Sequence, residues 1–438
     1  MRLVFAAVVA VLFALPAVAA DVVAIKAGRM VDVTAKRVLA DQVILIEDRR
    51  ITAVGRDVAI PSGARVIDLS EATVLPGLID VHTHLTYDPV LKPDEILALS
   101  YPRLAILAAM NARATLLAGF TTVRDAGAEG YADVAVRDGI ERGDIMGPRV
   151  FAAGPWIGQT GGHCDDNSLG PQYEHRASGV ADGIDEIRRM VRMHAKYGVD
   201  LIKFCASGGI FTSGDLPGAP EYSIDEVNVL VEEAHRLNRT VAAHAHAAEG
   251  IKNAIRAGAD SIEHASLVDD EGIRLARRAG TVFVMDIYNT DYTQAEGKKN
   301  GLDDETLKQD REYGEIQRER FRRAVAGGVA MAFGTDVGLF PHGTNAKQLA
   351  VMVRYGMTSM EAIVAATLNG AKLLKREKDF GAIEAGRFAD IIAVRGDPIA
   401  DVAVLERVSF VMKEGRVYRG SPAQCDAAPA RWACEAAD

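Results

Sequence analysis

Short apolar runs alternate with helical stretches through the middle of the chain. Helical spacing of apolar residues separates the runs, as after Ser223, where Ser223 and Glu226 have the spacing of a capping box. Strands that alternate with helices indicate a parallel sheet, and eight of them over about 300 residues favour a closed (β/α)8 TIM barrel over an open sheet. The eight strand-like runs are Leu78–His84, Thr121–Asp125, Arg149–Ala153, Leu201–Ala206, Val241–His246, Ser261–His264, Val282–Ile287 and Ala330–Asp336.

Both ends of the chain have a different pattern, in which β-branched runs are broken by glycine and other turn residues. These runs are Val22–Lys26, Gln42–Glu47, Ile51–Val54 and Ala64–Asp68 near the N-terminus, and Ala389–Val394 and Ser409–Tyr418 near the C-terminus. We expect residues 21–75 and 382–420 to form one small β-sandwich domain from both termini. The barrel then occupies residues 76–381, and residues 421–438 form a C-terminal tail.

The first twenty residues have the layout of a signal peptide. Arg2 precedes an almost wholly apolar run from Leu3 to Leu15, and Pro16 and four small residues follow it. The apolar run is shorter than the ~20 residues that span a bilayer. We therefore expect cleavage near Ala20, export to a secreted or periplasmic location, and no stable membrane insertion of the mature protein.

Composition excludes some classes of partner. The chain has 438 residues, of which 49% are hydrophobic and 25% charged, enough for a large core. Its formal net charge is −10. Nucleic acid is not an expected partner, because a protein that neutralises phosphates needs a basic face.

Four cysteines are too few for a disulfide scaffold. Cys425 and Cys434 lie close together in the tail and could form a disulfide in an oxidising compartment. Cys164 and Cys205 lie in core-like segments, where we expect inert buried thiols.

Candidate metal ligands stand at the C-terminal ends of the predicted strands, where barrel active sites lie. The first strand ends in His82 and His84, which share one face because they are two residues apart. A single histidine at a strand end is more often a satisfied polar residue than a ligand. Five strands with such residues are not explained in that way, and their types suit divalent metals. The others are Lys203, His244, His246, His264 and Asp336.

These residues lie in motifs that resemble the metal-dependent amidohydrolase superfamily, in order from about residue 22 to 418. The resemblance is to the imidazolonepropionase-like branch with Xaa-Pro dipeptidases, lysine/arginine carboxypeptidases and ochratoxin-degrading amidohydrolases. The motifs are Pro76-Gly-Leu-Ile-Asp-Val-His-Thr-His84, Gly119-Phe-Thr-Thr-Val-Arg-Asp125, Thr160-Gly-Gly-His163, Asp200-Leu-Ile-Lys203, His244-Ala-His246, Ser261-Ile-Glu-His264, Gly334-Thr-Asp336 and Gly386-Arg-Phe-Ala-Asp390.

The resemblance implies two divalent metal ions, most simply Zn²⁺, and a ligand set. His82 and His84 bind one ion, His244 and His264 the other, and Asp336 is the last ligand and moves protons. Lys203 becomes an N6-carboxylysine that bridges both ions. Burial favours this modification, because an uncharged amine is nucleophilic. His246 shares a strand face with His244, so either histidine could reach metal, and we assign His244.

The expected reaction is attack on an amide carbonyl by hydroxide held between the two ions, with Asp336 delivering a proton to the leaving nitrogen. In the resembling enzymes a histidine at the position of His163 helps to polarise the carbonyl. Candidate substrate contacts are His163, His246, Tyr222, Tyr288 and His342, although each tyrosine is more often a packing residue.

The predicted function is cleavage of the C-terminal amide bond of dipeptides or N-acyl amino acids. Xaa-Pro, Xaa-Lys/Arg and ochratoxin-like N-aroyl-phenylalanine are the substrate types, and a homo-oligomer is expected from the relatives. One alternative is a cyclic-amide hydrolase or deaminase of the imidazolonepropionase type. Such enzymes resemble a one-metal branch without the bridging lysine, so Lys203 argues against it. A non-catalytic binding module is the other alternative, which would not require the complete ligand set.

The remaining polar residues of interest receive structural roles. His194 and His235 lie on predicted amphipathic helices, and His175 lies in a polar loop. Arg124 is expected to pair with Asp125 or another neighbour.

Overall fold

The structure is a computed structural model that describes residues 22–91, 93–210, 217–421, 423–425 and 434–436. The expected signal peptide lies outside these residues. Within them, no helix combines the length and apolar character needed to cross a membrane.

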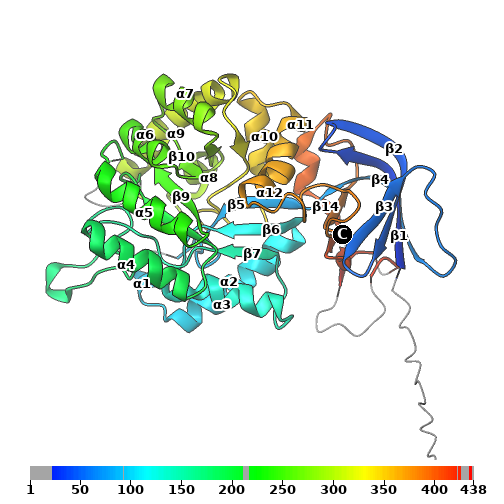
Figure 1. Cartoon of the computed structure of the whole chain (residues 1–438), viewed down its shortest axis with the longest axis horizontal. Coiled ribbons are helices and arrows are strands. Elements are labelled where there is room, and N and C mark those ends of the chain that lie inside the picture. Colours follow the sequence, from blue (N-terminus) through cyan, green and yellow to red (C-terminus); the bar gives the residue numbers. More distant parts are fainter. Residues whose placement is uncertain (1–21, 92, 211–216, 422, 426–433, 437–438) are drawn as a thin grey trace, which may run out of the picture.

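Eight parallel strands, β5 to β12, form the central part of the molecule. Figure 1 shows their arrangement. They agree with the eight predicted runs, with shorter ends in most cases. Three strands make one sheet in the order β5-β6-β7, and five make a second sheet in the order β12-β11-β10-β9-β8. Their bounds are β5 Leu78–Thr83, β6 Phe120–Asp125, β7 Arg149–Ala152, β8 Leu201–Cys205, β9 Thr240–Ala245, β10 Ser261–His264, β11 Val282–Val284 and β12 Met331–Ala332.

Backbone hydrogen bonds connect the two sheets at both pairs of edges. Beyond β12, Val337 forms a parallel bridge with Thr83 of β5. Beyond β7, Ile157 forms a parallel bridge with Phe204 of β8. These two bridges link the outer strands of one sheet to the outer strands of the other.

Helices follow the strands and surround them (Figure 1). Helix α5 begins with the predicted capping box, in which Ser223 and Glu226 bond each other's backbone N–H. The helices are α1 Pro93–Leu97, α2 Tyr101–Leu117, α3 Ala132–Glu141, α4 Gly183–Lys196, α5 Ile224–Arg236, α6 Ala248–Ala257, α7 Asp270–Ala279, α8 Asn289–Glu296, α9 Asp304–Ala326, α10 Lys347–Arg354, α11 Ser359–Val364 and α12 Gly370–Leu373.

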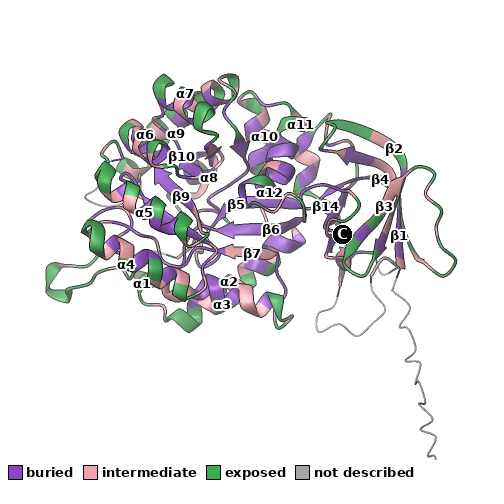
Figure 2. Ribbon diagram, viewed as in Figure 1, coloured by how far each residue is buried: buried purple, intermediate pink, exposed green. Residues whose placement is uncertain are grey.

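The parallel strands are buried on both faces (Figure 2). Every residue of β5, β6, β8 and β10 is buried, although these strands hold Asp80, His82, Arg124, Lys203 and Glu263. Charged groups in such a place are retained only where partners compensate them. The strands therefore hold a network of polar side chains inside an apolar shell.

Both ends of the chain meet in one eight-stranded sheet beside the parallel strands (Figure 1). Its order is β16-β15-β14-β13-β4-β1-β2-β3. The bounds are β1 Val22–Asp32, β2 Arg37–Glu47, β3 Arg50–Gly55, β4 Arg65–Pro76, β13 Ile391–Val394, β14 Val408–Lys413, β15 Arg416–Gly420 and β16 Glu435–Ala436.

This terminal sheet curls over its own core. Arg50 of the edge strand β3 forms a bridge with Phe388, which precedes β13. Ile46 and Ile51 from one side of the sheet share a core with Phe410 and Met412 from the other side. The described strands thus form one continuous sheet. The sequence had predicted a β-sandwich, which consists of two sheets.

The chain passes from the terminal sheet to the parallel strands at Pro76-Gly77. The Gly77 N–H donates to Asp390 O at 2.9 Å, and a Cβ at Gly77 would lie 2.1 Å from Thr121 Oγ1. Only glycine leaves room for this close approach. Strand β5 begins directly after Gly77, and His82 lies on it five residues after this glycine.

Two disulfides lie within the described residues. Cys425–Cys434 is the bridge in the tail that the sequence left possible. Cys164–Cys205 shows that the expectation of two inert thiols was wrong. The two cysteines are 41 positions apart, and they meet because the irregular segment after β7 returns to the end of β8.

Candidate metal centre

The candidate ligands from five strands come together where those strands end. Three overlapping groups each place their ligand atoms within 4.8 Å of one another. They are His82, His84 and Asp336; His244, His246 and His264; and His264, Asp286 and Asp336. Asp336 and His264 each belong to two groups, so the described residues form one continuous cluster.

The first group is organised around one carboxylate oxygen. Oδ1 of Asp336 lies 3.0 Å from Nε2 of His84 and 3.3 Å from Nε2 of His82. Burial would raise the pKa of Asp336, but the neighbouring histidines hold it well below its ordinary value. Asp336 is therefore an anion at neutral pH, which suits a metal ligand.

The second group consists of three imidazole rings packed close together, of which His246 and His264 are stacked and His244 meets both edge-on. The ring centroids of His244 and His264 lie 4.4 Å apart, and those of His246 and His264 lie 4.8 Å apart. Nε2 of His244 is buried and has no hydrogen-bond partner among the described residues. Burial also lowers the pKa of His244 and of His246, so both rings are neutral. An unpaired, neutral imidazole nitrogen fits a divalent metal such as Zn²⁺.

Lys203 stands between the groups. Its Nζ lies 3.3 Å from Nε2 of His82, and its charge also contributes to the low pKa of His244. Burial lowers the pKa of the Lys203 amine to about 8. An amine with this pKa is partly neutral, and hence nucleophilic, near pH 7.

Carboxylates behind the histidines orient their rings, and this role was not predicted from the sequence. Nδ1 of His264 lies 2.8 Å from Oδ1 of Asp286, and Nδ1 of His82 lies 2.9 Å from Oε2 of Glu263. Such partners fix the tautomer and leave Nε2 for metal. Asp286 is the second-to-last residue of the seventh predicted strand, so a polar residue near the end of an apolar run was the available signal. Glu263 directly precedes His264 on the same strand. Its pairing with a histidine of a different strand could not be seen from the sequence.

Two candidate ligands have left-handed backbone conformations. The φ angle is 68° at His264 and 57° at Asp336. Side-chain-bearing residues rarely adopt this region, and such conformations collect at functional sites because surrounding structure must hold them. The two residues are therefore held in place by the fold rather than by local preference.

His163 lies against the second group. Its ring is stacked on that of His244, with centroids 4.1 Å apart and planes at 25°. Burial lowers the pKa of His163 to about 3, so the ring is neutral. His163 is thus placed as a neutral hydrogen-bonding group beside the cluster.

The other predicted substrate contacts lie in three different settings. The Tyr222 hydroxyl donates to Ala181 O at 2.7 Å, and the residue is 4% exposed, which agrees with the packing alternative. Both ring nitrogens of His342 are close to protein atoms, Thr115 Oγ1 at 3.0 Å and His84 O at 3.2 Å. Tyr288 is half-buried beside Phe340, with ring centroids 5.0 Å apart.

His246 lies within the ligand cluster. Its Nδ1 lies 2.8 Å from Oγ of Ser266, which leaves Nε2 directed to the other ligand atoms of its group. The structure brings together His82, His84, Lys203, His244, His246, His264, Asp336 and His163. The polar atoms of Tyr222 and His342 are instead engaged by other protein atoms.

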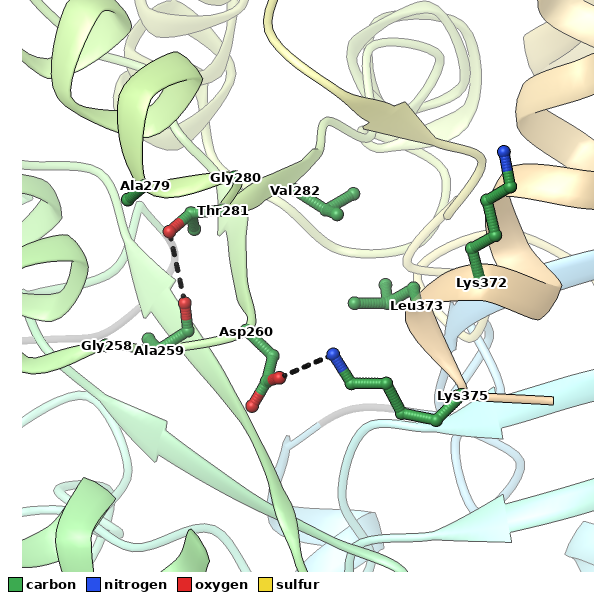
Figure 3. A pocket seen from close by; sticks show the side chains of 10 residues that line it. All are labelled: Gly258, Ala259, Asp260, Ala279, Gly280, Thr281, Val282, Lys372, Leu373 and Lys375. Carbon is green, nitrogen blue, oxygen red and sulfur yellow. Dashed lines mark hydrogen bonds and ion pairs between the residues drawn. The ribbon is translucent and has the colours of Figure 1, made fainter. Parts of the chain in front are cut away.

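A cavity of about 320 Å³ lies at the opposite end of the strands (Figure 3). Asp260 and Thr281, which precede β10 and β11, line it, and Asp260 forms an ion pair with Lys375 at 3.2 Å. Its described lining residues include no histidine. The metal-type chemistry therefore lies elsewhere, at the carboxyl ends of the strands.

Comparison with known proteins gives this cluster a family. Residues 73–418, which contain every candidate ligand, match the amidohydrolase family. The chain belongs to the amidohydrolase family. Membership confirms the resemblance seen in the sequence, and it makes the protein a hydrolase that acts on carbon–nitrogen bonds.

Individual amidohydrolases match most of the chain. Ochratoxinase from Aspergillus niger is 32% identical over 411 residues, covering 87% of this chain and 84% of that protein. Imidazolonepropionase from Chromobacterium violaceum is 24% identical and covers 89% of this chain and 93% of its own length. A crystal structure of a Xaa-Pro dipeptidase with bound methionine has a TM-score of 0.86 and 37% identity, covering 91% of this chain and 100% of that one.

Amidohydrolases are typically metal-dependent, and the described residues fit that property. Buried carboxylates and neutral imidazoles converge from several strands, with an unpaired nitrogen on His244. The protein therefore has histidine and aspartate groups able to bind metal.

Proposed function

We propose that this amidohydrolase uses two divalent metal ions, most simply Zn²⁺, to release the C-terminal amino acid from dipeptides or N-acyl amino acids. The observation that carries the proposal is the place of Lys203, a buried amine beside His82 whose charge reaches both histidine groups. A single-metal site has no need of an anionic bridge at this position. The eight strands are inferred to close into a (β/α)8 barrel that holds the site.

Different residues of the cluster would hold each metal ion and supply the bridging anion. His82, His84 and Asp336 would hold one ion, and His244 and His264 the other, with His246 as the alternative to His244. The neutral Lys203 amine adds to carbon dioxide and releases one proton, which gives a carbamate anion in place of a costly buried cation. When bound, the ions supply positive charge that polarises the amide carbonyl and activates water.

Proton movement is assigned to Asp336. Its Oδ1 faces His82 and His84, whereas Oδ2 has Asn289 Nδ2 at 3.4 Å, so Oδ2 is the oxygen left for a proton. This oxygen takes a proton from the attacking water and delivers it to the leaving nitrogen. The neutral His163 ring donates its N–H to the developing oxyanion.

Substrate class rests on the relatives. Ochratoxinase and Xaa-Pro dipeptidase support an acyl group joined to a C-terminal amino acid, with proline or phenylalanine as the leaving part. A basic leaving residue stays a prediction. The protein is also inferred to be exported, because two disulfides suit an oxidising compartment. Assembly into a homo-oligomer stays a prediction.

The test is a substrate panel with metal analysis. Purified protein is assayed for released amino acid from Xaa-Pro, Xaa-Lys, Xaa-Arg, Xaa-Phe and ochratoxin-type amides, and its metal is counted per chain. Release from at least one member and about two ions per chain are expected. One ion per chain, with turnover of a cyclic amide and of no panel member, would favour the imidazolonepropionase-type alternative.

A further inference from the structure

The Cys164–Cys205 disulfide joins two parts of the candidate site. Cys164 directly follows His163, and Cys205 ends strand β8 two residues after Lys203. The Cα atoms of the two cysteines lie 5.9 Å apart. One covalent bond thus connects the segment that holds His163 with the strand that holds Lys203.

The segment that holds His163 has little regular structure to position it. Between β7 and α4 it contains a short 3-10 turn at Pro171–Tyr173 and isolated bridges. Connections of this length are unusual in compact domains unless they serve a function. Gly161, with a φ of 75°, and Gly162 directly precede His163, and glycine has the largest backbone freedom to lose.

The disulfide completes the attachment of this irregular segment to β8. Before the two glycines, Ile157 bridges Phe204 of β8. After them, Cys164 is bonded to Cys205, the next residue of the same strand. Residues 158–163 are therefore fixed to one buried strand at both ends, with a further contact from the His163 N–H to Glu221 Oε1 at 2.6 Å.

The ring of His163 occupies a narrow place. One face is stacked on His244, with centroids 4.1 Å apart. A Cβ at Gly209 would lie 2.1 Å from Nδ1 of His163. In the β8–β9 pairing, Cys205 lies opposite His244. The disulfide and the ring on which His163 stacks therefore lie at the same ends of these two strands. A small shift of the segment would move the ring out of this place.

We propose that the Cys164–Cys205 disulfide is a positioning element that holds His163 over the metal cluster, so that reduction of this bond lowers turnover without releasing metal. The inference rests on the proposed role of His163. The disulfide itself does not touch the reacting atoms. In the reduction, a phosphine attacks one sulfur and the S–S bond breaks. Water supplies oxygen to the phosphine and two protons to the sulfurs, so that two thiols and a phosphine oxide form.

The experiment uses the holoenzyme in which Cys425 and Cys434 are replaced by serine. This control variant removes the tail disulfide and should keep wild-type activity. Adding Cys164→Ser and Cys205→Ser is expected to lower kcat about 10- to 100-fold, because misplacement by about 1 Å has effects of this size. KM and metal content should stay close to the control, since the lost contact acts in the transition state. Unchanged kcat, or loss of metal, would overturn the proposal.

Reduction of the control variant gives the same test without buried serines. The protein is treated with tris(2-carboxyethyl)phosphine, its thiols are counted by alkylation and mass spectrometry, and activity is followed through reoxidation. Activity should fall as two thiols appear and return as they disappear. Full activity with two free thiols would contradict the proposal.

A double-mutant cycle separates positioning from general stability. In a His163→Ala background, removal of the disulfide should lower kcat little further, because its effect acts through the absent ring. Additive losses would show a role unrelated to His163.

Hydrogen exchange provides a readout that needs no substrate. Amides of residues 158–165 should exchange faster after reduction, while those of β5 and β10 stay protected. If the panel reveals no hydrolysis, the proposed function fails, but this measurement still decides whether the disulfide holds the segment. Unchanged exchange in residues 158–165 would overturn the positioning role.

Discussion

Oδ1 of Asp286 lies 2.8 Å from Nδ1 of His264, and this contact determines which ring nitrogen faces the ligand cluster. Burial alone would lower the pKa of His264, but the Asp286 carboxylate raises it above its ordinary value. The same oxygen accepts a hydrogen bond from Gln317 at 3.1 Å, and Oδ2 accepts one from Asn289 at 2.7 Å. Asp286 is therefore positioned to accept a hydrogen bond from Nδ1 of His264, which leaves Nε2 of His264 facing the ligand cluster.

Replacement of Asp286 by asparagine should weaken metal binding. The amide can donate to Nδ1 of His264 and so favour the tautomer with its proton on Nε2. Loss of such a partner typically costs about 10- to 100-fold in metal affinity. Competition with a calibrated chelator measures the change.

Asp310→Asn is the matched control for this substitution. Asp310 is also a buried carboxylate, but it accepts hydrogen bonds from Thr290 and Gln294. Its replacement should leave metal affinity within about threefold of the wild type, whereas equal losses in both variants would mean that Asp286 acts through stability alone.

Lys203→Met should abolish the bridging anion. We expect loss of at least one ion per chain and a fall in kcat of about 100-fold or more, since both depend on the carbamate. Metal analysis and native mass spectrometry measure this, because the wild-type chain should be heavier by one carbon dioxide. A fully active Lys203→Met protein with one ion would refute the proposed bridge.

Lys413→Met is a control with the same chemistry at another place. Burial lowers the pKa of Lys413 to about 8 as well, and its Nζ donates to Gly147 O at 2.7 Å. Lys413 belongs to β14 of the terminal sheet. Its loss should lower stability and leave the metal content unchanged.

The sequence predicted most of this architecture because the signals were local or repeated. Buried parallel strands are short apolar runs, and the residues that follow them stand at one end of the sheet. His82, His84, Lys203, His264 and Asp336 could be found in this way. Contacts between distant segments were not visible.

The Cys164–Cys205 bond and the carboxylate partners of the histidines show why. Nothing in residues 153–182 indicates that this irregular segment returns to β8, since its path depends on tertiary contacts. Arg124 was expected to pair with Asp125 or a neighbour, but it reaches Glu263 on another strand at 2.7 Å. Side chains on different strands meet according to strand register, which one sequence alone does not supply.

Arg124→Met should be strongly destabilising. Arg124 is 1% exposed, and it compensates the buried charge of Glu263, which in turn faces Nδ1 of His82. Removing one member of a buried ion pair costs about 3–5 kcal/mol, because the other charge remains without compensation. Urea unfolding of the metal-loaded protein measures the loss.

Two further variants test whether the uncompensated charge of Glu263 causes the loss of stability in Arg124→Met. Adding Glu263→Gln should recover part of the stability, because it removes the uncompensated charge. Arg322→Met breaks an exposed pair with Glu319 and should change the free energy of unfolding by less than about 1 kcal/mol. If the double variant is no more stable than Arg124→Met, the cost comes from lost packing instead.

His194 should make the protein less stable in acid. Its ring is buried in α4, where Nε2 lies 2.9 Å from Pro155 O and Nδ1 lies 3.0 Å from the Tyr131 hydroxyl. Burial lowers the pKa of His194 to about 4, from an ordinary value of 6.5. The unfolded chain therefore binds a proton at a higher pH than the folded chain. The stabilising contribution is complete above pH 6.5 and is lost as the pH falls toward 4.

A comparison with His194→Gln isolates this contribution. At pH 7.5 the variant should be less stable by about 1 kcal/mol, because one hydrogen bond is lost. As the pH falls from 6.5 to 4, the difference should shrink or reverse by up to about 3 kcal/mol, because glutamine takes up no proton. Tyr131→Phe keeps the imidazole and should retain the wild-type pH dependence. Urea unfolding at a series of pH values checks both variants, and parallel curves for wild type and His194→Gln would contradict the assignment.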